Sequence, residues 1–185
     1  MSLNNTPSSE RVHIALFGRR NVGKSSVINA ITNQQLSIVS EFEGTTTDPV
    51  YKSMELLPIG PVVLIDTAGL DDEGSLGTLR IQKTYQVLNK TDIALLIVDS
   101  SKGITELDVK LMERFRSKKL PYVVAFNKAD LCPPVIPYDL QEHCIGISAK
   151  TGENIQELKE LLGKQIKSMP AQKMIVSDLL EPNDL

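Results

Sequence analysis

The sequence has little cysteine, no long hydrophobic run and no large excess of either charge. Its two cysteines, Cys132 and Cys144, are too few for a disulfide framework and lack the CxxC spacing of a metal knuckle, so we expect both to stay reduced in a cytoplasm. Apolar runs such as residues 93–98 are far too short to cross a bilayer. Residues 1–10 have neither the basic start nor the apolar stretch of a signal peptide. These absences predict a cytoplasmic protein with no membrane partner.

The charge balance is close to neutral. The formal net charge is -3, and no run of lysine and arginine exceeds a pair. A dedicated nucleic-acid binder carries a strongly basic surface, so we do not expect nucleic acid to be a partner. A chain of 185 residues with 41% apolar composition suits one domain with a single core. We assign this domain to residues 11–167, and expect a disordered N-terminal tail at residues 1–10 and a C-terminal tail at residues 168–185.

Strand-like and helix-like patterns alternate along the chain. Short apolar runs that indicate buried strands lie at residues 12–17, 62–65, 93–98, 122–126 and 144–147. Residues 50–57 alternate in hydrophobicity and precede a turn rich in proline and glycine, which predicts a hairpin. Helical spacing of apolar residues falls between the strands, for example at residues 24–32 and 155–166. The pattern predicts an α/β fold with a mainly parallel sheet, helices on both faces and one antiparallel edge strand.

A phosphate-binding motif, GxxxxGK[ST], runs from Gly18 to Ser25, after a predicted strand and at the start of a predicted helix. In such a loop the glycines let backbone N–H groups curl around phosphates, and the helix N-terminus adds a favourable dipole. Lys24 is expected to reach the terminal phosphates, and the Ser25 hydroxyl to bind Mg²⁺. The residues expected to contact the nucleotide here are Arg20, Asn21, Val22, Gly23, Lys24, Ser25 and Ser26.

Two further clusters suit the metal and the terminal phosphate. Asp66 ends a predicted strand, where its carboxylate can hold Mg²⁺ through water, and Gly69 allows the backbone to approach a γ-phosphate. The loop at residues 44–48 contains three threonines, of which we choose Thr46 as the residue that completes the magnesium shell when GTP is bound. Taken alone, three threonines in a loop indicate only an exposed surface loop. Their position between the other clusters is what favours magnesium binding.

The base-recognition residues follow two later strands. Asn127-Lys128-Ala129-Asp130 and Ser148-Ala149-Lys150 each begin where a predicted strand ends. Asp130 can accept two hydrogen bonds from guanine N1 and N2, which adenine cannot donate, so the site is expected to select GTP over ATP. We expect Lys128 to cover the base and the Ala149 N–H to meet guanine O6. Asn127 is expected to tie the two loops together. The predicted base-binding set is Asn127, Lys128, Asp130, Ser148, Ala149 and Lys150.

Five clusters in this order resemble the Ras-like P-loop GTPases, and more narrowly the branch that contains Era and the tRNA-modification GTPases, which share GRxNVGKS, GTTxD and DTAGL. The resemblance spans residues 12 to about 166. It implies the three-layer P-loop NTPase fold of a Ras-like G domain. It also implies Mg²⁺-dependent hydrolysis of GTP to GDP and phosphate, with the nucleotide state acting as a switch.

Several segments are similar to the HydF family, the GTPases of [FeFe]-hydrogenase maturation, and DPVYKSMELLPIGPV at residues 48–62 separates this resemblance from the branch at large. It implies a longer protein, homodimeric through a second domain whose first residues would lie within residues 168–185. It also implies a third domain with an iron–sulfur cluster, whose ligand cysteines are absent from this sequence. The partners it implies are the hydrogenase apoprotein and the radical-SAM maturases HydE and HydG.

Asn21 is the residue that we expect to take part in stimulating GTP hydrolysis. Ras-like enzymes orient the attacking water with a glutamine after the DxxG turn, whereas this chain has Leu70. In the branch that the sequence resembles, K⁺ is held by the phosphate-loop asparagine and by carbonyls of the first switch, so we expect Asn21 to bind K⁺ and stimulate hydrolysis. The groups assigned to catalysis are therefore Lys24, Asn21, Thr46 and Gly69. The alternatives are that Asn21 only braces the loop, that the domain is a nucleotide-stabilised docking platform with little turnover, or that it is a tRNA- or ribosome-associated GTPase.

Overall fold

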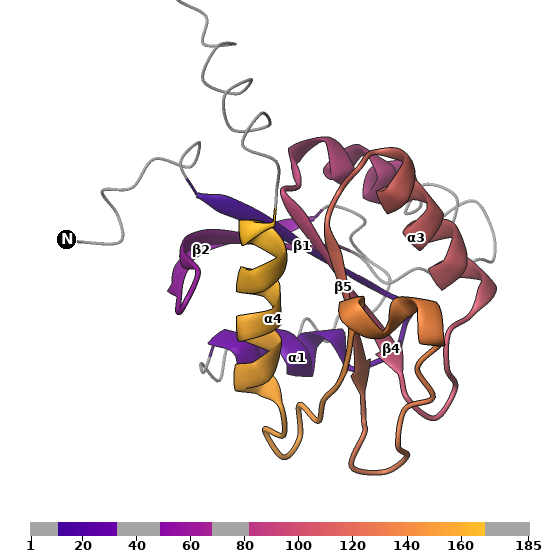
Figure 1. Cartoon of the computed structure of the whole chain (residues 1–185). Helices are drawn as coiled ribbons and strands as arrows, with labels where there is room; N and C mark the ends of the chain where they lie inside the picture. The colour runs from indigo at the N-terminus through magenta and orange to yellow at the C-terminus, as the bar shows by residue number, and fades with distance from the viewer. Residues whose placement is uncertain (1–10, 33–48, 68–81, 169–185) are drawn as a thin grey trace, which may run out of the picture.

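One sheet, with strand order β2-β3-β1-β4-β5-β6, forms the centre of the computed structural model, which describes residues 11–32, 49–67 and 82–168 (Figure 1). The strands are β1 (Val12–Gly18), β2 (Val50–Leu56), β3 (Gly60–Asp66), β4 (Ile93–Asp99), β5 (Tyr122–Asn127) and β6 (Cys144–Gly146). Neighbouring strands are parallel except β2, which pairs antiparallel with β3 at the sheet edge. The predicted mainly parallel sheet with one antiparallel edge strand is confirmed.

Helices cover both faces of this sheet. The helices are α1 (Lys24–Thr32), α3 (Glu106–Ser117) and α4 (Ile155–Lys167), with 3₁₀ turns η3 (Leu88–Lys90) and η4 (Tyr138–His143). Residues 82–87 are helical and lead into η3. The apolar sides of α1 and α4 share one hydrophobic cluster with the sheet, and α3 shares another with η3 and η4. The arrangement is the predicted three-layer α/β fold.

The alternation of side chains along the strands explains why both faces need covering. In β1, Ile14 and Leu16 belong to the cluster under α1 and α4, whereas Ala15 and Phe17 belong to the cluster under α3. All four side chains are fully buried. A strand buried on both faces must be apolar at every position, which is why the parallel strands read as continuous hydrophobic runs in the sequence.

Helix α3 begins at a reciprocal cap. Thr105 is its N-cap, and Asp108 accepts hydrogen bonds from both the backbone N–H and the hydroxyl of Thr105, each at 2.9 Å. In its last turn, the ring of Phe115 lies 5.4 Å from that of Phe17 and 5.7 Å from that of Tyr122. These contacts attach the helix to β1 and β5.

The boundaries differ from the prediction by one or two residues at most strands. The run predicted to end at residue 147 ends as a strand at Gly146, and the irregular segment expected after Cys132 contains the 3₁₀ turn η4. No helix in the described ranges has both the length and the apolar character needed to span a bilayer. The expected tails at residues 1–10 and 168–185 lie outside the described residues except for residue 168.

Candidate nucleotide-binding site

The loop between β1 and α1 requires its glycines. Gly23 has φ +87°, and a β-carbon there would lie 2.4 Å from Nδ2 of Asn127. A β-carbon on Gly18 would lie 2.9 Å from the Val22 side chain and 3.0 Å from the Ile97 carbonyl oxygen. The loop is therefore packed tightly against β4 and β5 and leaves no room for side chains at these two positions.

Lys24 and Asp66 face each other beside this loop. Asp66 ends β3 next to β1, and its Oδ1 lies 3.2 Å from Nζ of Lys24. Only 11% of the Lys24 side chain is exposed. Burial lowers the pKa of Lys24 from its ordinary value, while the Asp66 carboxylate acts in the opposite direction by favouring the ammonium form. The pair thus places an ammonium group and a carboxylate together at the phosphate end of the sheet.

The residues around Asp66 fit a magnesium ion of the kind that keeps several waters and phosphate oxygens. Oδ1 of Asp66 is buried, and the Lys24 ammonium group lies 3.2 Å from it without good hydrogen-bond geometry, so a metal ion could replace the ammonium group there. Ser25, the second predicted ligand, is the next residue after Lys24 and is half-buried. Within the described ranges no group of three or more His, Cys, Asp or Glu side chains could hold a metal. Besides Asp66, the described residues therefore offer an ion here the Ser25 hydroxyl, to be joined by water and phosphate oxygens.

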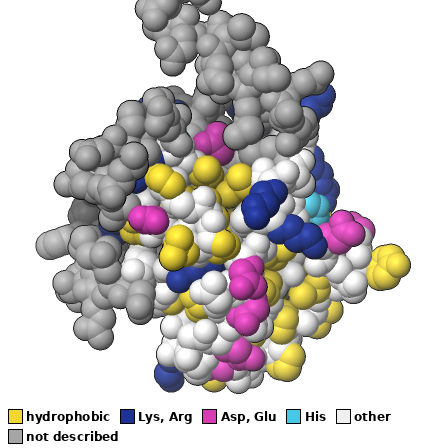
Figure 2. Space-filling view, turned by 60° about the vertical axis from the view of Figure 1, so that its left-hand side comes forward, with side chains coloured by type: hydrophobic (Ala, Val, Ile, Leu, Met, Phe, Trp, Pro, Cys, Tyr) yellow, Lys and Arg dark blue, Asp and Glu magenta, His cyan; other side chains and the backbone are white. Residues whose placement is uncertain are grey.

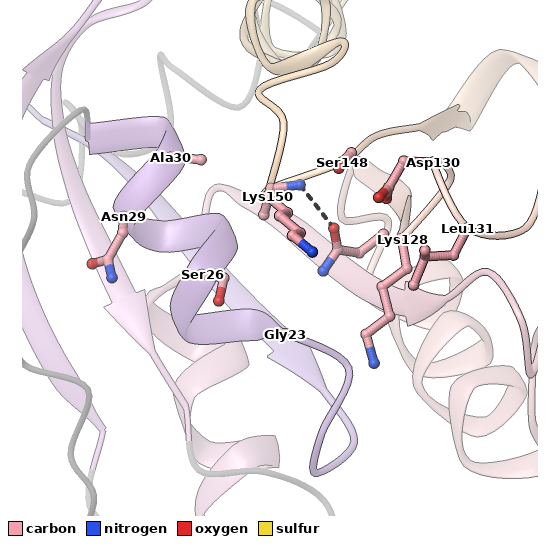
Figure 3. Close-up of a pocket in the computed structure, with 11 residues that line it drawn as sticks. Gly23, Ser26, Asn29, Ala30, Lys128, Asp130, Leu131, Ser148 and Lys150 are labelled. Atoms are coloured by element: carbon pink, nitrogen blue, oxygen red, sulfur yellow. Dashed lines mark hydrogen bonds between the residues drawn. The ribbon is translucent and has the colours of Figure 1, made fainter.

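Asn127, at the end of β5, connects the phosphate loop to the loop after β6. Its Nδ2 donates to the Val22 carbonyl at 2.9 Å, and its Oδ1 accepts from the Ala149 N–H at 3.0 Å (dashed line in Figure 3). Asn127 as a whole is 3% exposed. The predicted role of Asn127 as the tie between loops is present in the structure, although it reaches the phosphate loop as well. The Ala149 N–H, expected to meet guanine O6, donates to Asn127 here, and its contact with O6 stays a prediction.

Lys128 links the same loop to β4. Its Nζ lies 3.0 Å from the Asn21 carbonyl oxygen and 3.0 Å from Oδ2 of Asp99. Oδ1 of Asp99 accepts from the N–H and the hydroxyl of Ser101 at 2.9 and 2.6 Å. Burial acts to raise the pKa of Asp99, but the hydrogen bonds from Ser101 and Lys128 outweigh it, and the pKa is lowered. Sequence reasoning missed Asp99, although it ends a buried strand as Asp66 does.

A cavity of about 560 Å³ opens between α1 and the two base-recognition loops (Figure 3). Its lining residues are Gly23, Ser26, Asn29, Ala30, Asn127, Lys128, Asp130, Leu131, Ser148, Ala149 and Lys150. All six residues of the predicted base-binding set are among them, together with Gly23 and Ser26 from the set expected to contact the nucleotide at the phosphate loop. Asn29, Ala30 and Leu131 were not predicted, although Asn29 and Ala30 share a helical face with Ser26 at a spacing of three and four residues. A cavity of this size is in the usual range for small-molecule sites.

Of the remaining predicted residues, some lie in the phosphate loop and others lie outside the described residues. Asn21 and Arg20 are exposed at the tip of the phosphate loop, and Asn21 has a left-handed backbone with φ 67°. Val22 beside them is buried, with its carbonyl bound to Asn127. Thr46 and Gly69 lie outside the described residues, as does Leu70. The structure therefore describes the phosphate and base sides of the candidate site, and the predictions for both switch residues stay predictions.

A mainly parallel α/β sheet with a GxxxxGK[ST] loop and an NKxD loop meeting at the carboxyl ends of its strands defines a P-loop GTPase domain. Comparison with known families agrees. The chain belongs to the 50S ribosome-binding GTPase family, whose model matches residues 13–128.

Named relatives extend this assignment. The chain is 37% identical over 158 residues to the tRNA modification GTPase MnmE of Nitrosomonas europaea, with 84% of this chain and 35% of that protein covered. It is 32% identical over 174 residues to the GTPase Der of Nitratiruptor sp., with 86% of this chain and 37% of that protein covered. The chain thus spans about a third of the length of these relatives.

A solved structure matches over most of the chain. The crystal structure of Era in complex with MgGDPNP and part of 16S ribosomal RNA has a TM-score of 0.71 and 25% identity, with 94% of this chain and 60% of that chain covered. The P-loop GTPase class and its Era-like and tRNA-modification branch are therefore confirmed. These relatives are not named for hydrogenase maturation, so they lend no support to the narrower HydF resemblance. They also give no support to the expectation that the protein has no nucleic-acid partner.

Gly23→Ala tests the close packing of the phosphate loop. The new methyl group would displace the Asn127 amide, and the left-handed backbone adds strain. Because lost hydrogen bonds of a buried amide cost about 1–3 kcal/mol, we expect GDP binding to weaken by about tenfold or more, measured by titration calorimetry. The matched control is Gly103→Ala, at φ +72° with no atom within 4 Å of the added carbon. Wild-type affinity in Gly23→Ala would contradict this account of the loop.

Proposed function

We propose that this domain binds GTP in the cavity between α1 and the base-recognition loops, hydrolyses it to GDP and phosphate, and acts as a nucleotide-dependent switch. The observation that carries the proposal is the hydrogen bonding of Asn127, which draws the phosphate loop and both base-recognition loops into one cavity. Membership of a GTPase family supports it from a second direction.

The base side of the cavity provides the groups for guanine. Asp130 is exposed at the cavity wall, where its two carboxylate oxygens accept from guanine N1 and N2. Adenine would present an acceptor and leave a carboxylate oxygen unpaired, which disfavours ATP. For guanine O6 we propose the Ser148–Lys150 loop, with the Ala149 N–H shared between Asn127 and the base in a three-centre hydrogen bond.

The phosphate side provides positive charge and backbone donors. Lys24 approaches the terminal phosphates from a buried position, where its charge is weakly screened. The N–H groups of residues 20–26 surround the phosphates, and the start of α1 adds its dipole. Ser25 and Asp66 would hold Mg²⁺, with Thr46 joining when GTP is bound and Gly69 meeting the γ-phosphate. Bound Mg²⁺ neutralises charge that builds on the phosphoryl group.

We also propose that K⁺ stimulates hydrolysis through Asn21. The side chain of Asn21 is exposed at the tip of the phosphate loop, on a left-handed backbone whose carbonyl is held by Lys128. This arrangement leaves the amide oxygen available for a cation beside the phosphates. A potassium ion there would add positive charge where other GTPases use an arginine.

The process served by the switch has two candidates. The tRNA modification GTPase MnmE and the Era structure with 16S ribosomal RNA favour a role linked to RNA, and we take this as the first candidate. Hydrogenase maturation is the second, and it is supported by the HydF-like segment at residues 48–62. The described part of this segment, residues 49–62, contains β2 and the start of β3. The partners in hydrogenase maturation would be the hydrogenase apoprotein, HydE and HydG. Where Figure 2 shows described residues, basic, acidic and hydrophobic side chains are interspersed, with no broad basic area among them.

Phosphate release tests the hydrolytic proposal. With Mg²⁺, we expect release from GTP and not from ATP, and faster release in potassium than in sodium buffer.

Asn21→Gly is the matched variant for the potassium proposal, because glycine keeps the left-handed backbone and the carbonyl bound by Lys128 but removes the proposed potassium ligand. It should bind GDP as the wild type does and lose the potassium effect. Equal rates in the two buffers would overturn the potassium proposal, and tight binding without release would favour a docking platform.

Stimulation by partners separates the two processes. GTP turnover is measured with tRNA or a 16S ribosomal RNA fragment, and separately with hydrogenase apoprotein, HydE or HydG. We expect RNA to raise turnover, and to do so less as salt increases, because phosphate contacts release counterions. Stimulation by the hydrogenase proteins alone would instead support the second candidate and reject the first.

A further inference from the structure

Asp99 is a buried acid that the proposed mechanism leaves unused. It ends β4, is 4% exposed, and has both carboxylate oxygens engaged. Oδ1 accepts from the N–H and hydroxyl of Ser101, two residues later, which closes a tight turn at the end of the strand. Oδ2 accepts from Nζ of Lys128 at 3.0 Å. The turn therefore fixes the carboxylate, and the carboxylate is aimed at one partner in a different loop.

That partner lies between β4 and the phosphate loop. The ammonium group of Lys128 donates to Asp99 and also to the Asn21 carbonyl oxygen at 3.0 Å. Figure 3 shows the Lys128 side chain extending along the cavity, away from Asp130 and toward the phosphate-loop side. Lys128 has φ 66°, a left-handed conformation that costs a non-glycine residue energy and needs support from its surroundings. Its head group is thus held at two points while its aliphatic stem lines the cavity.

Asp99 supplies the negative charge in the hydrogen bonds that the Lys128 ammonium group makes to described residues. Among the described residues, the other acceptor of the Lys128 ammonium group is the neutral carbonyl of Asn21. A charge-assisted hydrogen bond to a buried carboxylate is about twice as strong as a neutral one. The Asp99 side chain is 5% exposed and that of Lys128 37% exposed, so the pair is partly shielded from solvent screening.

We infer that Asp99 is a positioning residue for nucleotide binding: through Lys128, it holds the lysine stem along the base cavity and fixes the carbonyl of Asn21 in the phosphate loop. This inference rests on the proposed function, because it assumes that the cavity binds a guanine nucleotide. It adds a residue outside the five sequence clusters, and it links guanine recognition to the phosphate loop through a fixed charge.

Asp99→Asn tests the inference. Asparagine is similar in size and keeps an oxygen for the Ser101 turn, but it presents an amide donor to the Lys128 ammonium group. We expect the dissociation constant for GDP to rise by about tenfold, measured by calorimetry with Mg²⁺. The control is Ser101→Ala, which removes a hydrogen bond from the other oxygen of the same carboxylate and leaves the Lys128 pair intact. It should change GDP affinity less than about twofold.

A double-mutant cycle with Lys128→Met distinguishes positioning from general damage to the fold. If Asp99 acts through Lys128, then Asp99→Asn produces no further loss of GDP affinity once Lys128 is replaced. Equal losses in both backgrounds, or wild-type affinity in Asp99→Asn, would overturn the inference. Failure of the wild-type protein to bind GDP would instead overturn the proposed function itself, so the two failures are distinguishable.

Discussion

The amide side chain of Asn127 has hydrogen-bond partners more than twenty residues away in both directions along the chain. It donates to the Val22 carbonyl and accepts from the Ala149 N–H, at 2.9 and 3.0 Å, while almost fully buried. Leaving a buried amide unpaired costs about 1–3 kcal/mol, so the three loops that meet there are held in one arrangement. The need for glycine at position 23 follows, because any β-carbon there would occupy the space of this amide.

The sheet explains how these loops come to meet. Strands β1, β3, β4, β5 and β6 are parallel, so their carboxyl ends lie along one edge of the sheet. Two of those ends carry acids that face lysines: Asp66 with Lys24, and Asp99 with Lys128. Both lysines also border the phosphate loop. The site therefore places two ammonium groups at the phosphate loop before any nucleotide arrives. In the proposed complex Lys128 stays with Asp99, whereas Lys24 exchanges Asp66 for the phosphates as Asp66 takes up Mg²⁺.

The sequence was enough to predict the layers of the fold and most of the site. The apolar run at residues 12–17 predicted β1 to within a residue, because a strand buried on both faces is continuously apolar in the sequence. The helical spacing of apolar residues predicted α1 at its observed bounds. The motif residues of the cavity were predicted because their order along the chain is typical of the class. Asp99 was not, since its pairing with Lys128 depends on β4 and β5 being neighbours. The acceptor of the Ala149 N–H was missed because a tertiary hydrogen bond leaves no periodic pattern.

The central claim is that these loops form one site for a guanine nucleotide. Titration calorimetry of the wild-type chain with GDP and with ADP, both with Mg²⁺, tests it directly. We expect one GDP per chain and binding at least about 10²-fold weaker for ADP, because a site built to accept hydrogen bonds from the base discriminates strongly against a base that lacks the donors. Equal affinity for the two nucleotides, or no binding of GDP, would contradict it.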